Sequence, residues 1–320
     1  MSRPEAAKYM QRNLIILVLG MLLFNGWQKV AASQAPWRMG LRLNNQQARR
    51  GFALLPFARG VPIIPVQQWA PTNNPALLST NRAVLPETLR VLFLGNALTA
   101  GHNMPEVLTR MSRTGKLKIK ATMRAPYGYT LDNHMADISS RTNISFTIQD
   151  PLTFTNRLSW HAVILQEHSL VPVYGWQRLL NSVQRLDGAV QTARTQTALF
   201  MPQSRSDPIF SEAEFLDRSE GAYRLAAQRN GNLPVIPGGR AWQMVEMRGD
   251  NSIQLRERDG QLPTAHGAYL NACVMYAFLT WQTPLGLSNG GLHQINERDA
   301  EYLQRIAWEL FVSRRGGVPF

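Results

Sequence analysis

The chain has 320 residues, of which 44% are hydrophobic and 17% charged, and its formal net charge at pH 7 is +13. The apolar content excludes a disordered chain, and the length suits one large domain or two small ones. Residues 1–60 hold nine basic residues and one acid, Glu5, a net charge of +8 that leaves +5 for the other 260 residues. No aromatic stripe, zinc-ligand spacing or recognition helix accompanies this charge, so the sequence does not predict a nucleic-acid-binding protein.

Residues 1–35 have the pattern of an export signal. Lys8 and Arg12 precede the apolar run 14-LIILVLGMLLF-24, and small residues follow in 30-VAASQA-35. A basic region, a short apolar region and small residues in this order are typical of a secretory signal peptide. The run is short for a hydrocarbon core of ~30 Å, but an uncleaved N-terminal anchor is the alternative. Both predict a folded part outside the cytoplasm, in the periplasm or the extracellular space.

Residues 36–87 are predicted to form an irregular lead-in. They contain seven prolines, and the part from 36 to 60 has five basic residues and no acid. A basic segment close to an apolar anchor suits an anionic membrane or envelope surface. A solvated stretch without a partner explains the same charges equally well.

From residue 88 to 320 the pattern predicts one globular domain in which strands and helices alternate. Apolar runs of strand length occur at 90–95, 117–123, 162–166, 197–201 and 233–237. Helical patterns occupy 104–114, 130–139, 175–195, 211–229, 239–247, 265–281 and 296–313. Because the strands lack polar alternation, helices are expected on both faces of a mostly parallel sheet. The predicted fold is a three-layer α/β/α domain with a doubly wound five-stranded sheet, and 249–260 is expected to be a hairpin or a loop.

The only cysteine, Cys273, lies among small apolar residues of the 265–281 helix and cannot form an intrachain disulfide. A buried structural thiol is expected there. No motif predicts a metal site, and no cofactor is expected.

The residues that follow the strands are the candidate site, because ligands bind at the carboxyl ends of parallel strands. After the first three strands, and further along the chain, stand four blocks: 95-GNALTAGHNMP-105, 128-GYTLDNH-134, 160-WHAVILQEHS-169 and 259-DGQLPTAHGAYL-270. In this order they resemble the blocks of the SGNH (GDSL-like) hydrolase superfamily, in particular a bacterial branch whose first block is G-N-S-[FL]-T followed by N-M-P. The resemblance covers about residues 88–315 and implies the flavodoxin-like fold of that superfamily.

The resemblance also implies an ester-hydrolysing site. In the family, a serine after the first strand attacks an ester carbonyl, and its N–H, a glycine N–H and a side-chain amide stabilise the oxyanion. A histidine three residues after an aspartate takes the serine proton. Here the serine position is Ala97 and the histidine position is Leu262, whereas Asp259 is present. The oxyanion positions fall on Ala97, Gly128 and Gln166.

Further residues of the blocks are expected to contact the ligand: Asn96, Tyr127, Tyr129 and Glu167. His266, one helical turn after Leu262, is the candidate for a substitute base. His134 is expected to be a partly buried histidine bonded to the backbone, and His168 with Ser169 has no obvious acid partner.

Three hypotheses remain open. The first is an exported, catalytically inactive SGNH-type protein that binds a small-molecule or glycan ester, whether the loss of serine and histidine is natural or engineered. The second is an active ester hydrolase, a carbohydrate deacetylase or lipase-like enzyme, with a non-standard nucleophile and base. The third is a membrane-proximal scaffold that acts through residues 36–60. The sequence does not predict the oligomeric state.

Overall fold

The computed structural model describes residues 87–140, 160–192, 195–249 and 252–314. The export signal or anchor at 1–35 and nearly all of the lead-in at 36–87 lie outside these residues, so both stay predictions. Within the described ranges, no helix is long and apolar enough to cross a membrane.

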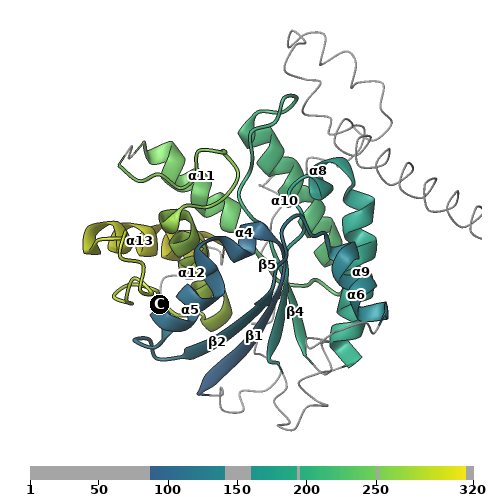
Figure 1. Ribbon diagram of the computed structural model, residues 1–320, viewed down its shortest axis with the longest axis horizontal. Helices are drawn as coiled ribbons and strands as arrows, with labels where there is room; N and C mark the ends of the chain where they lie inside the picture. Colours follow the sequence, from purple (N-terminus) through teal and green to yellow (C-terminus); the bar gives the residue numbers. More distant parts are fainter. Residues whose placement is uncertain (1–86, 141–159, 193–194, 250–251, 315–320) are drawn as a thin grey trace, which may run out of the picture. The chain divides into compact units, whose positions relative to one another are not determined.

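A parallel sheet of five strands forms the centre of the described domain, in the order β2-β1-β3-β4-β5 (Figure 1). The strands are β1 (Thr88–Leu94), β2 (Lys118–Arg124), β3 (Ala162–Leu165), β4 (Gln196–Phe200) and β5 (Val235–Ile236). The chain starts at β1, adds β2 on one side, and then adds the other three strands on the opposite side. The doubly wound α/β sheet expected from the apolar runs is therefore confirmed.

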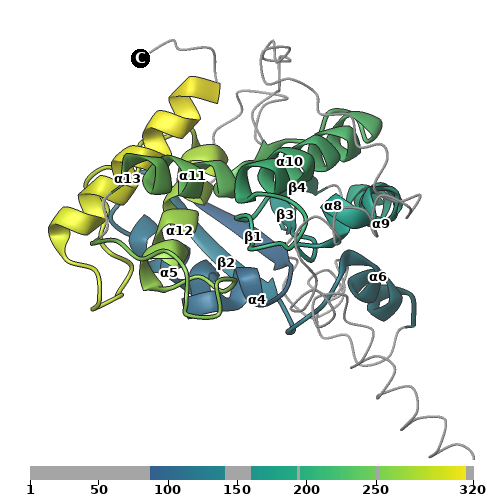
Figure 2. The same ribbon diagram turned by 90° about the horizontal axis from the view of Figure 1, so that it is seen from above.

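Helices cover both faces of the sheet (Figure 2). One face packs on α5 (Met104–Ser112), α11 (Gly238–Arg248), α12 (Ala265–Thr280) and α13 (Glu297–Arg314). The other packs on α6 (Leu131–Ser140), α9 (Trp176–Thr192) and α10 (Glu212–Arg229). In β1, Val91 and Phe93 belong to the first core and Leu92 and Leu94 to the second. Because side chains of a strand alternate between faces, a continuous apolar run is what a sheet covered on both sides requires.

The fifth strand is shorter than the predicted range 233–237. Only Val235 and Ile236 pair with β4, and prolines stand on both sides of them at 234 and 237. Proline has no N–H to donate to a ladder, and it is tolerated at the edge of a sheet, where β5 lies. The prolines thus limit the strand to two residues.

Two helices illustrate how local sequence fixes the elements. Helix α10 begins after Ser211, whose hydroxyl accepts from the N–H of Glu214 while the Glu214 carboxylate accepts from the N–H of Ser211. This reciprocal capping box satisfies two N–H groups that a helix start leaves free. Helix α12 is apolar around its whole circumference and is buried at the centre of the first core. Cys273 is fully buried there, and burial raises the pKa of its thiol, so the expected structural thiol is confirmed.

Three short helical turns lie near the carboxyl ends of the strands: α4 (Ala97–Ala100), η3 (Gly101–Asn103) and α8 (Val171–Tyr174). The segment between α11 and α12 is a loop over its described residues 252–264, with one antiparallel bridge between Arg256 and Pro263. Of these connections, the start of α4 and the end of the 252–264 loop contribute residues to the candidate site.

Candidate functional site

The turn after β1 is built around Asn96. Its side-chain oxygen accepts a hydrogen bond from the N–H of Leu98 at 3.1 Å, which caps α4. Its side-chain amide donates to the carbonyl of Tyr129 at 2.9 Å and ties this turn to the loop after β2. Asn96 is 2% exposed, and its two side-chain hydrogen bonds fix the turn that places Ala97 at the start of α4.

An open cleft of about 60 Å³ lies above this turn, at the carboxyl ends of the strands. It is lined by Asn96, Ala97, Leu98, Tyr127, Gly128, His168, Ser169, Gln203, Ser204, Arg205, Gln261 and Leu262. The structure therefore brings the serine position Ala97, the histidine position Leu262 and the glycine of the second block into one cleft. Neither Ala97 nor Leu262 has a side chain that can carry or accept a proton, so the two positions offer no acyl-transfer chemistry.

Two backbone donors remain available in the cleft. Among the described residues, the N–H groups of Ala97 and Gly128 make no hydrogen bond. Gly128 has φ +70°, a conformation that glycine adopts without strain, and a Cβ added to it would meet nothing within 4 Å. Backbone geometry alone therefore explains why glycine suits this position.

Gln166 lies behind Ala97 rather than in the cleft. It is 1% exposed, and its side-chain oxygen accepts from the N–H of Asn96 and from the hydroxyl of Thr99, both at 3.0 Å. Its side-chain amide donates to the carbonyl of Glu167. All of these bonds hold the first and third loops together, and none points the amide at a ligand carbonyl. The amide nitrogen has two N–H groups, of which Glu167 takes one, and Gln166 is not among the residues that line the cleft.

Asp259 closes the loop that carries Leu262. Its carboxylate accepts from the N–H groups of Gln261 at 2.8 Å and Leu262 at 3.0 Å. Gly260, which lies between Asp259 and Gln261, has φ +70°. The N–H of Glu257 donates to the carbonyl of Leu262 at 2.9 Å and completes the turn. The carboxylate is thus next to the histidine position, where it bonds the backbone.

The histidines lie in three different surroundings. His266, on α12, faces Asp299 of α13 with 3.3 Å between Nε2 and Oδ2, and it is not among the residues that line the cleft. His134 is buried, and its Nε2 donates to the carbonyl of Gly95 at 2.7 Å, which fits the backbone-bonded histidine expected from the sequence. Burial lowers the pKa of His134. His168 lines the cleft, and burial and then the charge of Arg205 lower the pKa of its imidazole, which favours the neutral ring.

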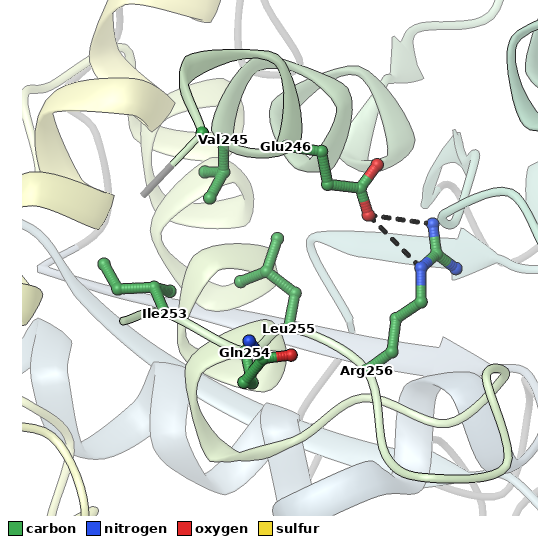
Figure 3. A pocket seen from close by; sticks show the side chains of 7 residues that line it. Val245, Glu246, Ile253, Gln254, Leu255 and Arg256 are labelled. Atoms are coloured by element: carbon green, nitrogen blue, oxygen red, sulfur yellow. Dashed lines mark hydrogen bonds and ion pairs between the residues drawn. The ribbon is translucent and has the colours of Figure 1, made fainter. Parts of the chain in front are cut away.

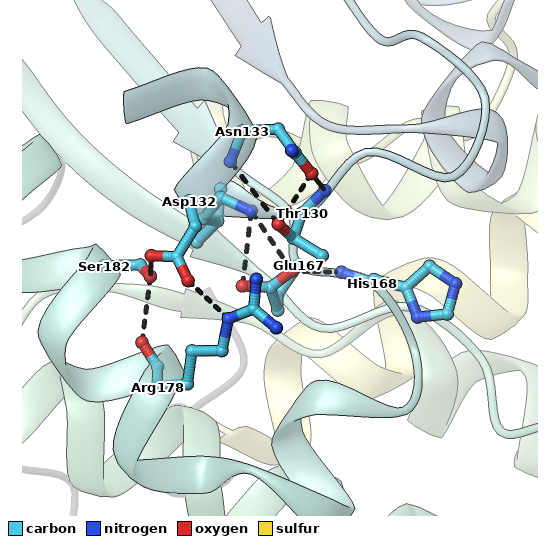
Figure 4. A network of polar contacts seen from close by, with 8 residues as sticks. Thr130, Asp132, Asn133, Glu167, His168, Arg178 and Ser182 are labelled. Atoms are coloured by element: carbon cyan, nitrogen blue, oxygen red, sulfur yellow. Dashed lines mark hydrogen bonds and ion pairs between the residues drawn. The ribbon is translucent and has the colours of Figure 1, made fainter. Parts of the chain in front are cut away.

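Glu167 is the centre of a polar network below the cleft (Figure 4). It is fully buried, and its carboxylate accepts from the N–H of Leu131 at 3.1 Å and of His168 at 2.6 Å. Leu131 is the first residue of α6, so Glu167 joins the loop after β3 to that helix. Burial raises the pKa of Glu167 to about 7, against the smaller, opposing effect of these N–H donors. Glu167 does not line the cleft, and the ring of His168 points away from its network.

Tyr127 and Tyr129 also differ in whether they line the cleft. Tyr127 lies at the rim of the cleft, and with 83% of its surface exposed its ring is accessible to a ligand. The ring of Tyr129 packs edge-on against His134 with 5.2 Å between centroids, and it does not line the cleft. Of the two expected ligand contacts, the structure brings only Tyr127 to the cleft.

Arg205 is a cleft residue that no sequence block identifies. It is half-buried, and among the described residues it forms no hydrogen bond and no ion pair. Burial lowers the pKa of its guanidinium, opposed chiefly by Asp207. Its position shortly after the fourth predicted strand is the signal that could have found it, because that strand ends at the same edge of the sheet.

A second cavity, of about 230 Å³, lies between α11 and the following loop (Figure 3). Val245, Ile253 and Leu255 line it, and the ion pair between Glu246 and Arg256 closes one side. Arg256 also donates to the carbonyl of Ser204, a residue of the cleft. The guanidinium of Arg256 is therefore hydrogen-bonded to protein groups, whereas that of Arg205 has no such partner among the described residues.

In the described ranges, no group of three or more His, Cys, Asp or Glu side chains that could hold a metal ion occurs.

Comparison with known proteins supports the fold. No protein-family model matches the sequence, and no curated protein is detectably similar to it. Among solved structures, a DUF4886 family protein from Bacteroides uniformis ATCC 8492 matches with a TM-score of 0.56 and 18% identity over 71% of this chain and 96% of its own. A candidate SGNH hydrolase from Slackia heliotrinireducens matches with a TM-score of 0.48 and 22% identity over 60% of this chain and 99% of its own. The esterase EstA from Pseudoalteromonas sp. matches with a TM-score of 0.43 and 14% identity over 60% and 97%. The match to the DUF4886 family protein supports the doubly wound α/β fold, and the resemblance to SGNH hydrolases stays a prediction from the four blocks.

Proposed function

We propose that this chain is an SGNH-fold protein that binds a small-molecule or glycan ligand in the cleft and does not hydrolyse esters. The observation that carries the proposal is that Ala97 and Leu262 line the same cleft. A hydrolase of this type needs a nucleophile and a base at those two places, and both are replaced by hydrocarbon side chains.

Three residues that look like remnants of catalysis have structural roles. Gln166 binds the backbone of the β1 turn, Asp259 closes the 259–262 turn, and Gly128 adopts a positive φ. Their presence therefore gives no support to an active site with unusual chemistry.

The rival hypothesis of an active hydrolase could use His168 and Ser169, the neighbouring pair that lines the cleft. The other serine of the cleft, Ser204, has its hydroxyl bonded to Glu212 and Arg256. Within the described residues, no hydrogen bond joins the two side chains. The nearby carboxylate of Glu167 accepts from the backbone N–H of His168 and does not orient its ring. A general base needs hydrogen-bond reach to the nucleophile and a group that orients it.

Reversion tests the proposal. Ala97→Ser and Leu262→His together restore the nucleophile and the base, the latter next to Asp259. We expect the double variant to hydrolyse a short-chain aryl ester with kcat/KM at least about 10²-fold above the parent, and each single variant to remain near the parent, because triad members act as a unit. A parent chain that already turns over the ester, and loses that activity on Ser169→Ala, would contradict the proposal.

We also propose export of the chain and attraction to an anionic surface, both of which concern N-terminal segments outside the described residues. Export rests on residues 1–35 and attraction to an anionic surface on residues 36–60. Sequencing the N-terminus of the mature protein, and binding of a variant that lacks 36–60 to anionic vesicles, test these parts separately from the cleft.

A further inference from the structure

We propose that the ligand of the cleft carries a carboxylate group and that Arg205 is the residue that recognises it. This inference rests on the proposed function, since it names the chemical class of the ligand for the same cleft.

The first step is the state of Arg205. A half-buried guanidinium without an ion pair or hydrogen bond is unfavourable, because the charge loses water and gains no partner. The two carboxylates that most nearly balance it are bound elsewhere: Asp207 accepts from the hydroxyl of Tyr174 at 2.8 Å, and Asp259 accepts from backbone N–H groups. Residues that lower stability in this way are typical of binding sites, where a ligand completes them.

The second step is the surroundings of Arg205. The cleft also contains Ala97 and Gly128, whose N–H groups are without partners in the described part of the chain. A planar guanidinium fits a carboxylate through two parallel hydrogen bonds, and backbone N–H groups can donate to the remaining lone pairs of the carboxylate oxygens. An uncharged ester offers only a weak acceptor to the same donors.

The third step is size. A volume of about 60 Å³ is several times the roughly 10–15 Å³ that a cavity needs to hold one water, so a small group such as a carboxylate suits the cleft. Ala97 also lacks the hydroxyl that a serine would place in the cleft, which leaves that space to the ligand. The rest of a larger ligand would extend past the exposed ring of Tyr127, a surface that suits the apolar face of a sugar ring.

Isothermal titration of the full chain tests the inference with four probes: D-glucuronate, acetate, D-glucose and inorganic phosphate. Glucuronate and acetate both carry a carboxylate. Comparing the two shows whether the cleft prefers a sugar acid or a simple acid. We expect at least one of the two to bind and Arg205→Gln to weaken that binding at least about tenfold, while glucose binds at least about tenfold more weakly than glucuronate. Arg113→Gln, which removes an exposed arginine outside the cleft, is the matched control and should leave binding unchanged.

The Tm of each variant shows whether a loss of binding is caused by a loss of structure. Because Arg205 has no protein partner among the described residues, Arg205→Gln should keep the Tm of the parent or raise it. The inference is overturned if Arg205→Gln binds the acids as the parent does, if glucose binds as tightly as glucuronate, or if neither acid binds. Phosphate that binds equally well to the parent and to Arg205→Gln would show an adventitious ion only. If the acids fail to bind but the double reversion gains esterase activity, the proposed function stands and only this inference fails.

Discussion

The layer of side chains beneath the β1 turn and the cleft above it are built from neighbouring residues of the same blocks, yet their bonding differs. Beneath the turn, Asn96, Gln166 and Glu167 are buried. Each side chain bonds the backbone of two residues, one in its own loop and one in another loop or helix. Above it, the side chains of Ala97 and Leu262 have no polar group, and Arg205 has a charge without a protein partner among the described residues. The lower layer is needed to fold the loops whether or not the cleft does chemistry. The upper layer is free to change with the ligand.

The difference between the two layers bears on which residues of a sequence block indicate a ligand. A buried amide or carboxylate within a catalytic block can be retained because leaving its backbone partners unsatisfied would cost about 1–3 kcal/mol each. Only groups that face the cleft and lack protein partners report on the ligand. By that criterion Arg205 is more informative here than Gln166 or Asp259.

The largest expected effect concerns the lower layer and pH. The pKa of Glu167 is raised from 4.5 in the unfolded chain to about 7 in the folded one, so the folded chain holds its proton over a range where the unfolded chain releases it. The contribution to stability is present in full below pH 4.5 and is lost as pH rises to about 7, a change of about 3 kcal/mol. Glu167→Gln should remove this fall, so the free energy of unfolding of parent and variant, measured in urea between pH 4.5 and 7.5, should converge or cross as pH rises.

An exposed carboxylate provides the control for this measurement. Glu301 pairs with Arg305 one helical turn away on the surface of α13, and Glu301→Gln should shift the curve by less than about 0.5 kcal/mol at every pH. If the curves of the parent and Glu167→Gln run parallel over the whole range, the buried carboxyl does not titrate as the network requires.

A smaller effect is expected at Gly95, where the lower layer touches the turn. A Cβ at this position would lie 2.5 Å from Oγ1 of Thr99 and 2.8 Å from Oε1 of Gln166. Both atoms are fixed by their mutual hydrogen bond, so Gly95→Ala should cost about 1–3 kcal/mol of unfolding free energy. Gly188 is the matched control, because it lies within helix α9 and a Cβ there meets nothing within 4 Å. Gly188→Ala should stabilise by up to about 1 kcal/mol, and an equal loss in both variants would argue against the crowding at Gly95.

Much of the fold was predictable because its signals are local. Apolar runs without alternation predicted the parallel sheet, and the helical pattern at 211–229 predicted the start of α10 to within one residue. The predicted strand 233–237 was too long, because it includes two prolines that limit β5 to the two residues between them. The gathering of Ala97, Gly128 and Leu262 in one cleft agrees with the rule for strand ends.

The direction of individual side chains was not predictable. Gln166 to Ser169 are consecutive, yet the first two point into the lower layer and the last two line the cleft. Past the end of a strand the alternation of faces no longer applies, and tertiary contacts such as the one between Glu167 and Leu131 decide the direction. Arg205 was missed for another reason: it belongs to no block, and its significance lies in the absence of a partner, which a sequence does not record.

The smallest expected effect is at His266. It tests whether a residue outside the two layers affects the chemistry of the cleft. The ring lies 3.3 Å from Asp299, a carboxylate that also accepts from the side-chain amide of Asn296 at 3.0 Å. Because this pair joins α12 to α13 outside the cleft, His266→Gln should lower the free energy of unfolding by less than about 1 kcal/mol. It should also leave the ester hydrolysis of the Ala97→Ser, Leu262→His variant unchanged, and His293→Gln, at an exposed loop position, is the control for both readouts. A base that acts at the cleft must reach its nucleophile directly or through one water, so a marked loss of turnover in His266→Gln but not in His293→Gln would mean that the histidine leaves Asp299 and enters the cleft.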